Sequence, residues 1–132
     1  MYVEGQGVSQ DYEQAVKWYR KADQQGNASA QSNLGLMYET GKGVSQDFEQ
    51  AVKWYRKAAQ QGKAIAQYNL GVKCSKGQGV LQNYVQAHKW FNLAAAGGYS
   101  DARTARGAVE QMMTRGQIAE AQTLAREWEP ER

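Results

Sequence analysis

The chain has very few of the residues on which many catalytic and metal sites depend. Its 132 residues include one cysteine, one histidine and one proline. A single cysteine excludes an intrachain disulfide. One histidine and one cysteine are also too few for a metal site made of those residues alone, or for a Cys-His-Asn triad. We therefore expect no metal, no other cofactor and no catalytic residues.

Long apolar segments are missing as well. No apolar run approaches the roughly 18 residues that a membrane span needs, and the first residues lack the basic and then apolar pattern of a signal peptide. Charged residues make up 22% of the chain and hydrophobic residues 42%, a composition too apolar for a disordered protein. The length favours a single folded domain over residues 1–132.

Glycine is abundant, and it recurs at a fixed interval. Twelve of the 14 glycines fall into four series with a spacing of 36 residues. The series are Gly5, Gly41 and Gly77; Gly7, Gly43 and Gly79; Gly26, Gly62 and Gly98; and Gly35, Gly71 and Gly107. Trp18, Trp54 and Trp90 keep the same spacing. A fixed period of about 20 to 50 residues indicates a stacked repeat.

Each period predicts two helices joined by a loop. Residues 11–25 carry an apolar stripe at helical spacing, made of Tyr12, Ala15, Val16, Tyr19 and Ala22. Ser9 or Asp11 would cap this helix, and Gly26 would end it in a left-handed conformation. Residues 28–39 form the second helix, in which Gly35 marks a close approach of two helices. A loop at 40–46 leads to the next helix near Asp47. No segment alternates as a strand does, so the predicted fold class is all-α.

At residues 64–94 the sequence resembles a known repeat. Residues 64–71 read Ala-Ile-Ala-Gln-Tyr-Asn-Leu-Gly, residues 77–80 read Gly-Gln-Gly-Val, and Asn83-Tyr84 begins a segment that runs to Ala94. This pattern resembles the Sel-one-like repeat (SLR), a relative of the tetratricopeptide repeat, over roughly residues 1–107. The resemblance implies a right-handed α-solenoid of about three helix pairs that binds other proteins. Its units are a truncated first repeat at 1–27, repeats at 28–63 and 64–99, and C-terminal cap helices at 100–129.

The N-terminal end differs from the middle of the chain. The first two residues align with Met37 and Tyr38, so the helix from Asp11 lacks its usual neighbour. Because a stacked repeat cannot bury its apolar face alone, we expect exposed apolar surface on this helix and on Tyr2 and Val3. One interpretation is that this end self-associates or that the chain is part of a longer protein. The alternative is that residue 1 is the genuine start and that the exposed apolar surface is tolerated.

The C-terminal end predicts a cap. Lys21 and Lys57 are replaced by Leu93, so a polar face becomes apolar in the third repeat; Ala96 likewise replaces two glutamines. A following helix would cover it with Ile118, Ala121, Leu124, Ala125 and Trp128, begun by a Thr114–Gln117 capping box and ended by Pro130. The helix before it, residues 100–113, would bury Ala102, Ala105, Val109 and Met112. The tail also resembles that of many bacterial members of the family. The compartment stays open: the protein of a bacterium could be cytoplasmic or exported to the periplasm.

Several isolated features suggest chemistry, but each has a simpler interpretation. Gly41-Lys42-Gly43 lacks the spacing of a phosphate-binding loop and recurs in every repeat, so we interpret it as a turn. His88, with no second histidine or obvious carboxylate partner, is interpreted as structural, and Cys74 as a half-buried apolar residue. Asp11 and Asp47 are interpreted as helix caps.

A basic stripe recurs as well. Lys17, Arg20 and Lys21 return as Lys53, Arg56 and Lys57, interleaved with aromatic residues. Because 13 acidic residues are spread among the 16 basic ones, a solvated helix face is favoured over a nucleic-acid surface, and we expect no nucleic-acid partner.

The resemblance also implies where a partner would bind. Tetratricopeptide groove positions correspond here to Ser29, Ser32, Leu36 and Glu39; to Ile65, Tyr68, Val72 and Ser75; and to Asp101, Thr104, Ala108 and Gln111. We expect Tyr68 and Leu36 to be the main anchors. Asn33 and Asn69 would either bond a peptide backbone or make contacts between repeats.

These observations favour a non-catalytic scaffold module that binds a protein or peptide in a concave groove. One alternative is a protein that binds or hydrolyses small cell-wall-type ligands, although the paired cysteines of that subgroup are missing. Another is a purely structural cap for a larger assembly.

Overall fold

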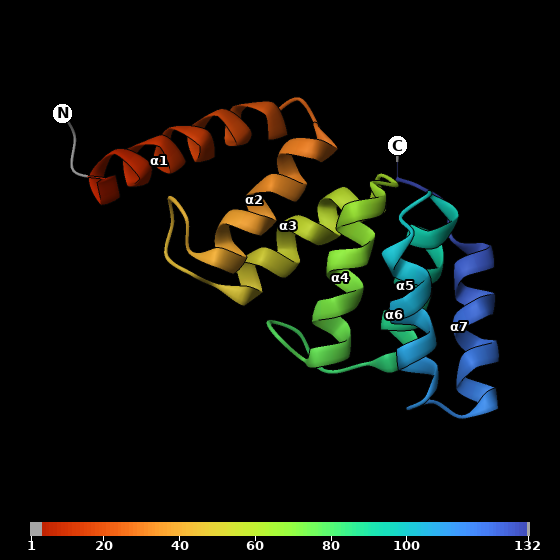
Figure 1. Ribbon diagram of the computed structural model, residues 1–132. Coiled ribbons are helices and arrows are strands. Elements are labelled where there is room, and N and C mark those ends of the chain that lie inside the picture. The colour runs from red at the N-terminus through yellow and green to blue at the C-terminus, as the bar shows by residue number, and fades with distance from the viewer. Residues whose placement is uncertain (1–3, 132) are drawn as a thin grey trace.

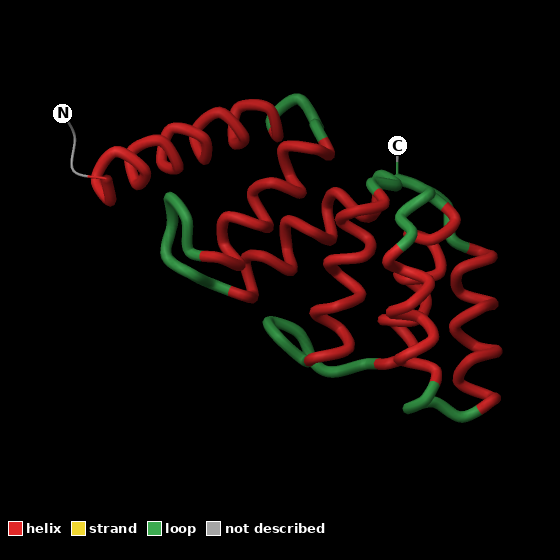
Figure 2. The backbone as a smooth tube through the Cα atoms, in the orientation of Figure 1, coloured by secondary structure: helices red, strands yellow, loops and turns green. Residues whose placement is uncertain are grey.

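The structure, a computed structural model, describes the backbone of residues 4–131 and the side chains of residues 10–131. Seven helices follow one another in this part of the chain, and Figure 2 shows that only turns and loops connect them. Their bounds are α1 Glu4–Asp23, α2 Ala28–Thr40, α3 Phe48–Gln60, α4 Ala64–Lys76, α5 Tyr84–Ala96, α6 Asp101–Glu110 and α7 Arg115–Glu127. The all-α prediction is confirmed for the described residues.

Consecutive helices pair into hairpins that stack along the chain. Helix α2 packs closely with α3 and α4 with α5, while α3 packs on α4 and joins one hairpin to the next. In Figure 1 the helices follow one another from α1 at one end to α7 at the other. The α2–α3 hairpin recurs after 36 residues as the α4–α5 hairpin, so the repeat read from the glycines is the repeat of an α-solenoid.

The helices begin and end where the sequence supplies caps. The Asp47 carboxylate accepts a hydrogen bond from the Gln50 N–H at 3.1 Å, and Asn83 does the same for Gln86 at 3.0 Å. Both caps satisfy a backbone donor that the first turn leaves free. At the other end of α2, Gly41 has φ +70° and donates its N–H to the Met37 carbonyl. Left-handed geometry of this kind is most accessible to glycine.

Gly35 and Gly71 bring the two helices of each hairpin together. A Cβ on Gly35 would lie 2.5 Å from the Tyr55 ring, and one on Gly71 would lie 2.7 Å from the Phe91 ring. Both rings are fully buried. The close approach predicted at Gly35 is therefore confirmed. It does not recur at Gly107, where no atom lies within 4 Å of the added Cβ.

Helix α1 begins earlier than the repeat predicts. It starts at Glu4, so Gly5 and Gly7 are helical and the predicted caps Ser9 and Asp11 lie inside the helix. In the next repeat the matching segment is a loop because the preceding helix holds it. The Asp47 N–H donates to the Tyr38 carbonyl at 2.8 Å. Within residues 4–131 no helix precedes α1. No carbonyl of such a helix holds residues 4–10 as a loop, and these residues continue α1 towards the N-terminus.

The exposed apolar surface expected on α1 is present at Trp18. This side chain is 68% exposed, whereas Trp90, two repeats later, is 2% exposed. Tyr2 and Val3 lie outside the described residues. Self-association through this end of the chain remains a prediction.

The C-terminal helices both pack on α5 and contact each other little. Thr114 and Gln117 form the predicted capping box at the start of α7. Ala121 and Ala125 are buried, and the Trp128 ring lies 6.2 Å from the Trp90 ring, edge to face. Beyond α7 the chain turns back, and the Glu131 N–H donates to the Gln60 carbonyl at 2.7 Å.

Three details of this C-terminal end differ from the prediction. Helix α6 ends at Glu110 because the next residues form a turn that leads to the capping box of α7. Met112 is in that turn and is 62% exposed instead of buried. Ala96 stays exposed because α7 packs along the part of α5 that carries Trp90.

Candidate partner-binding groove

Helices α2 and α4 line a shallow hollow of about 300 Å³. Seven residues line it: Ser29, Ser32, Asn33, Leu36, Lys63, Ile65 and Asn69. We call this hollow the α2–α4 groove. Leu36 is 48% exposed and Ile65 is 40% exposed, so two large apolar side chains face solvent within it. Isolated exposed apolar residues are common on protein surfaces, but two that share one hollow are a feature of contact sites.

Four of the predicted binding residues lie together in this groove. Ser29, Ser32 and Leu36 come from one face of α2, and Ile65 comes from the start of α4. The spacing of i, i+3 and i+7 on α2 places its three residues on the same side of the helix.

Tyr68, expected to be an anchor, lies elsewhere. Its ring packs 4.8 Å from the Tyr99 ring and 5.7 Å from the Phe91 ring, measured between centroids, and it is half-buried. Burial raises the pKa of the Tyr68 phenol, and the neighbouring Tyr99 and Asp101 add to the effect. Most of this side chain contributes to the core and not to the α2–α4 groove.

Glu39 and Ser75 use their polar groups within the protein. The Glu39 carboxylate accepts a hydrogen bond from the Tyr55 hydroxyl at 2.6 Å, and it pairs at 2.6 Å with the buried ammonium group of Lys73. The Ser75 hydroxyl donates to the Val72 carbonyl at 2.9 Å, and Val72 itself packs against the core. Glu39 therefore joins α2 to α3 and α4, whereas the Ser75 hydrogen bond stays within α4.

The remaining predicted positions lie on α6 and at Gln111, the residue that follows it. Asp101, Thr104, Ala108 and Gln111 are all exposed, and none of them lines the α2–α4 groove. The predicted binding residues therefore do not form one site. Some line the α2–α4 groove, some lie on the exposed surface of α6, and others pack against the core.

Asn33 and Asn69 lie in the groove, and neighbouring glutamines make the contacts between helices. The Gln67 amide donates to the Ala59 carbonyl at 3.2 Å, and Gln31 accepts a hydrogen bond from Gln61 at 2.7 Å. Neither asparagine side chain bonds to another side chain or carbonyl among the described residues. Both amides are thus available to a ligand.

Lys63 is the one charged residue among the described side chains that line the groove, and it was not among the predicted binding residues. It occupies the N-cap position of α4, where it makes no capping bond through its side chain. In the previous repeat Asn27 occupies this position and caps α2 with its side chain. The replacement of a capping residue by lysine was the signal that could have identified it.

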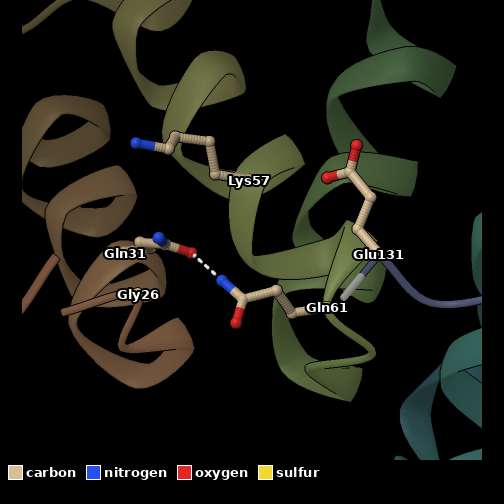
Figure 3. A pocket seen from close by; sticks show the side chains of 5 residues that line it. All are labelled: Gly26, Gln31, Lys57, Gln61 and Glu131. Atoms are coloured by element: carbon tan, nitrogen blue, oxygen red, sulfur yellow. Dashed lines mark hydrogen bonds between the residues drawn. The ribbon is translucent and has the colours of Figure 1, made fainter. Parts of the chain in front are cut away.

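A second hollow, of about 270 Å³, is a joint between repeats. Figure 3 shows the hydrogen bond between Gln31 and Gln61 at its centre, with Lys57 and Glu131 at its sides. Gln31 and Lys57 also bond to the Asp23 carboxylate, at 2.8 and 3.1 Å. Most of its polar groups are therefore used in holding α1, α2 and α3 together.

The residues that suggested chemistry make contacts inside the fold. His88 is 1% exposed, and its Nε2 lies 2.8 Å from Glu110, a carboxylate partner that the sequence did not reveal. Cys74 is 3% exposed and so more buried than expected, because α3, α4 and α5 surround it in the core. Burial raises the pKa of its thiol despite the opposing charges of Arg56 and Lys89.

No cluster of metal-ligating side chains occurs among residues with described positions. No helix in the described chain is long and apolar enough to cross a membrane.

The chain is similar to known repeat proteins. The model of the Sel1 repeat matches residues 1–27, 28–63 and 64–99. A protective antigen present in uropathogenic Escherichia coli strains, which displays an SLR fold, has a TM-score of 0.83 and 40% identity. That match covers 88% of this chain and 25% of the antigen chain. A Sel1 repeat protein from Oxalobacter formigenes has a TM-score of 0.73 and 42% identity, with 80% of this chain and 42% of that chain covered.

This chain thus spans about a quarter of one solved relative and about two fifths of the other. Among curated proteins, no sequence matches it. The repeat matches extend over most of its length, and the α2–α3 and α4–α5 hairpins each begin at the first residue of a matched repeat. The chain therefore belongs to the Sel1 repeat family.

Proposed function

We propose that this protein is a non-catalytic interaction module that binds a protein or peptide partner in the α2–α4 groove. Sel1 repeat proteins are typically scaffolds for protein interactions, which supports the general class. The assignment to this groove is our own and depends on its residues.

The observation that carries the proposal is the pairing of apolar and polar groups in one hollow. Leu36 and Ile65 expose large apolar surfaces, whose burial by a partner would stabilise a complex. Asn33 and Asn69 lie in the same hollow, one repeat apart in the sequence. A carboxamide can donate to a backbone carbonyl and accept from a backbone N–H, so the two asparagines suit an extended peptide.

Lys63 adds a positive charge to the rim of this groove. A partner segment with an acidic residue next to apolar ones would complement the site better than a basic segment. The groove is short, so a single linear segment should bind with modest affinity and dissociate readily.

The proposal is tested by affinity purification from the native cell with three baits. They are the wild-type chain, the Leu36→Asp/Ile65→Asp double variant, and Leu81→Asp as a matched control. Leu81 is 88% exposed and lies outside the groove. We expect the control to retain the partner and the double variant to lose it, with all three chains equally helical. Equal recovery by the double variant would contradict the proposal.

A further inference from the structure

A third hollow, of about 490 Å³, lies along α3 where the loop after α4 passes it. Val52 and Val80 form its apolar walls, and Lys53, Arg56, Lys57 and Glu49 surround them with charge. None of these residues belongs to the α2–α4 groove. We call this site the α3 basic hollow.

Arg56 has lost the partner that its equivalent has one repeat earlier. The Arg20 guanidinium donates to the Tyr38 hydroxyl at 2.7 Å. After 36 residues Arg56 takes the place of Arg20, but Cys74 takes the place of Tyr38. The buried thiol is a poor acceptor compared with a phenol. The half-buried Arg56 guanidinium makes no hydrogen bond or ion pair with any described residue.

Lys89 brings a second charge of the same sign close to Arg56. Lys89 is half-buried on α5 and forms no ion pair with a described carboxylate. Burial lowers the pKa of its ammonium group, and the charge of Arg56 lowers it further. The ammonium group lies 4.4 Å from the centroid of the Trp90 ring. This cation–π contact offsets only part of the free-energy cost of removing the charged group from water.

The carboxylates nearby do not balance these charges. Asp23 pairs with Lys57 at 3.1 Å, and that lysine is therefore largely neutralised. Glu49 lines the hollow but lies within 4 Å of no cation of the described chain. Arg56 and Lys89, which are both half-buried, thus leave an excess of positive charge where like charges repel more strongly than in water, and the exposed Lys53 adds a further charge to the lining of the hollow.

We propose that the α3 basic hollow binds an oxyanion, a carboxylate or a phosphate, carried on a small apolar body. Arg56 provides the planar donor pair that suits either oxyanion. Lys53 adds charge from the lining of the hollow, and Lys89 adds charge from α5, next to Arg56 and outside the lining. Val52 and Val80 contact the apolar part. This site is independent of the α2–α4 groove, so its test neither supports nor contradicts the proposed function.

The test uses four simple probes and the intact chain. Inorganic phosphate, phenyl phosphate, acetate and valerate are titrated separately, while NMR follows the side chains of Arg56 and Lys89. We expect shifts at both residues, with none at Ile65 in the other groove. Phenyl phosphate should bind more tightly than phosphate, and valerate more tightly than acetate. The stronger of the two pairs identifies the oxyanion.

Three variants make the test specific. Arg56→Gln should weaken binding about tenfold or more, since it removes a charge-assisted hydrogen bond. Cys74→Tyr should also weaken binding. The new phenol would accept a hydrogen bond from Arg56, as Tyr38 does from Arg20, and would compete with the ligand. Lys42→Gln, an exposed change outside the hollow, should leave binding unchanged. Arg56 and Lys89 resonances that stay fixed up to tens of millimolar of every probe would overturn the proposal without any variant.

Discussion

The ring of Tyr55 occupies the space that a side chain on Gly35 would need. The Tyr55 hydroxyl is held in turn by the Glu39 carboxylate at 2.6 Å, so the ring cannot move aside easily. Phe91 and Gly71 repeat the contact one unit later. The missing side chain at each of these glycines therefore allows the two helices of the hairpin to approach closely.

This relationship predicts opposite effects of the same substitution at two positions. Gly35→Ala should lower the free energy of unfolding by about 1–3 kcal/mol, because a methyl group overpacks against the ring. Gly107→Ala meets no atom within 4 Å, and it should raise stability by about 0.5–1 kcal/mol through helix propensity. Urea unfolding followed by circular dichroism measures both. A Gly35→Ala protein as stable as wild type would contradict the packing account.

Regular spacing made the hairpins predictable, whereas tertiary contacts decided the rest. The cap at Asp47 could be predicted from its position before an apolar stripe. The helical start of α1 could not, because the equivalent loop depends on a preceding helix. That loop also needs Gly43, whose Cβ would lie 2.5 Å from the Tyr12 carbonyl.

The candidate site was predictable in part for the same reason. Ser29, Leu36 and Ile65 line the groove as expected, since each helix face repeats its direction. Tyr68 is drawn into the core by Tyr99, whose equivalents are Asn27 and Lys63. Tyr99 differs from the residues at the equivalent positions of the other repeats, and its ring helps to bury Tyr68. The 36-residue period alone does not reveal such a contact.

The buried phenol of Tyr55 predicts a loss of stability at alkaline pH. Desolvation raises its pKa well above the ordinary value of 10.0, and the hydrogen bond to Glu39 and its charge add to the shift. The folded protein therefore keeps this proton where the unfolded chain releases it. The contribution is complete below about pH 10 and is lost as pH rises above that value. Unfolding free energies from about pH 8 to 11.5 should fall more steeply for wild type than for Tyr55→Phe. Parallel curves would contradict this assignment.

The His88–Glu110 pair predicts an asymmetric response to substitution. Glu110→Ala leaves the buried Nε2 of His88 without a partner and should cost about 1–3 kcal/mol. His88→Val introduces the residue found at the equivalent position 52, and it frees a carboxylate whose side chain is 35% exposed. Water can solvate that carboxylate, so the loss should be smaller. Chemical denaturation of both variants decides the order, and a larger loss for His88→Val would refute it.

The tryptophans at equivalent positions should differ sharply in importance. Trp90→Ala removes a ring that is 2% exposed and packs on Trp128, and it should cost about 3–5 kcal/mol. Trp18→Ala removes a ring that is 68% exposed, and it should change stability by no more than about 0.5 kcal/mol. Thermal unfolding of the two variants measures the difference. Similar losses of stability for the two variants would contradict this prediction, because they would mean that the Trp18 ring is covered in solution.

The groove itself is tested most directly by photo-crosslinking in the native cell. A photoreactive amino acid is placed at position 36, 65 or 81 in three separate chains, and the crosslinked products are identified by mass spectrometry. We expect positions 36 and 65 to capture the same protein through one short segment, and position 81 not to capture it. Capture of that protein from position 81 alone, or no product at positions 36 and 65, would contradict the assignment of the α2–α4 groove as the binding site.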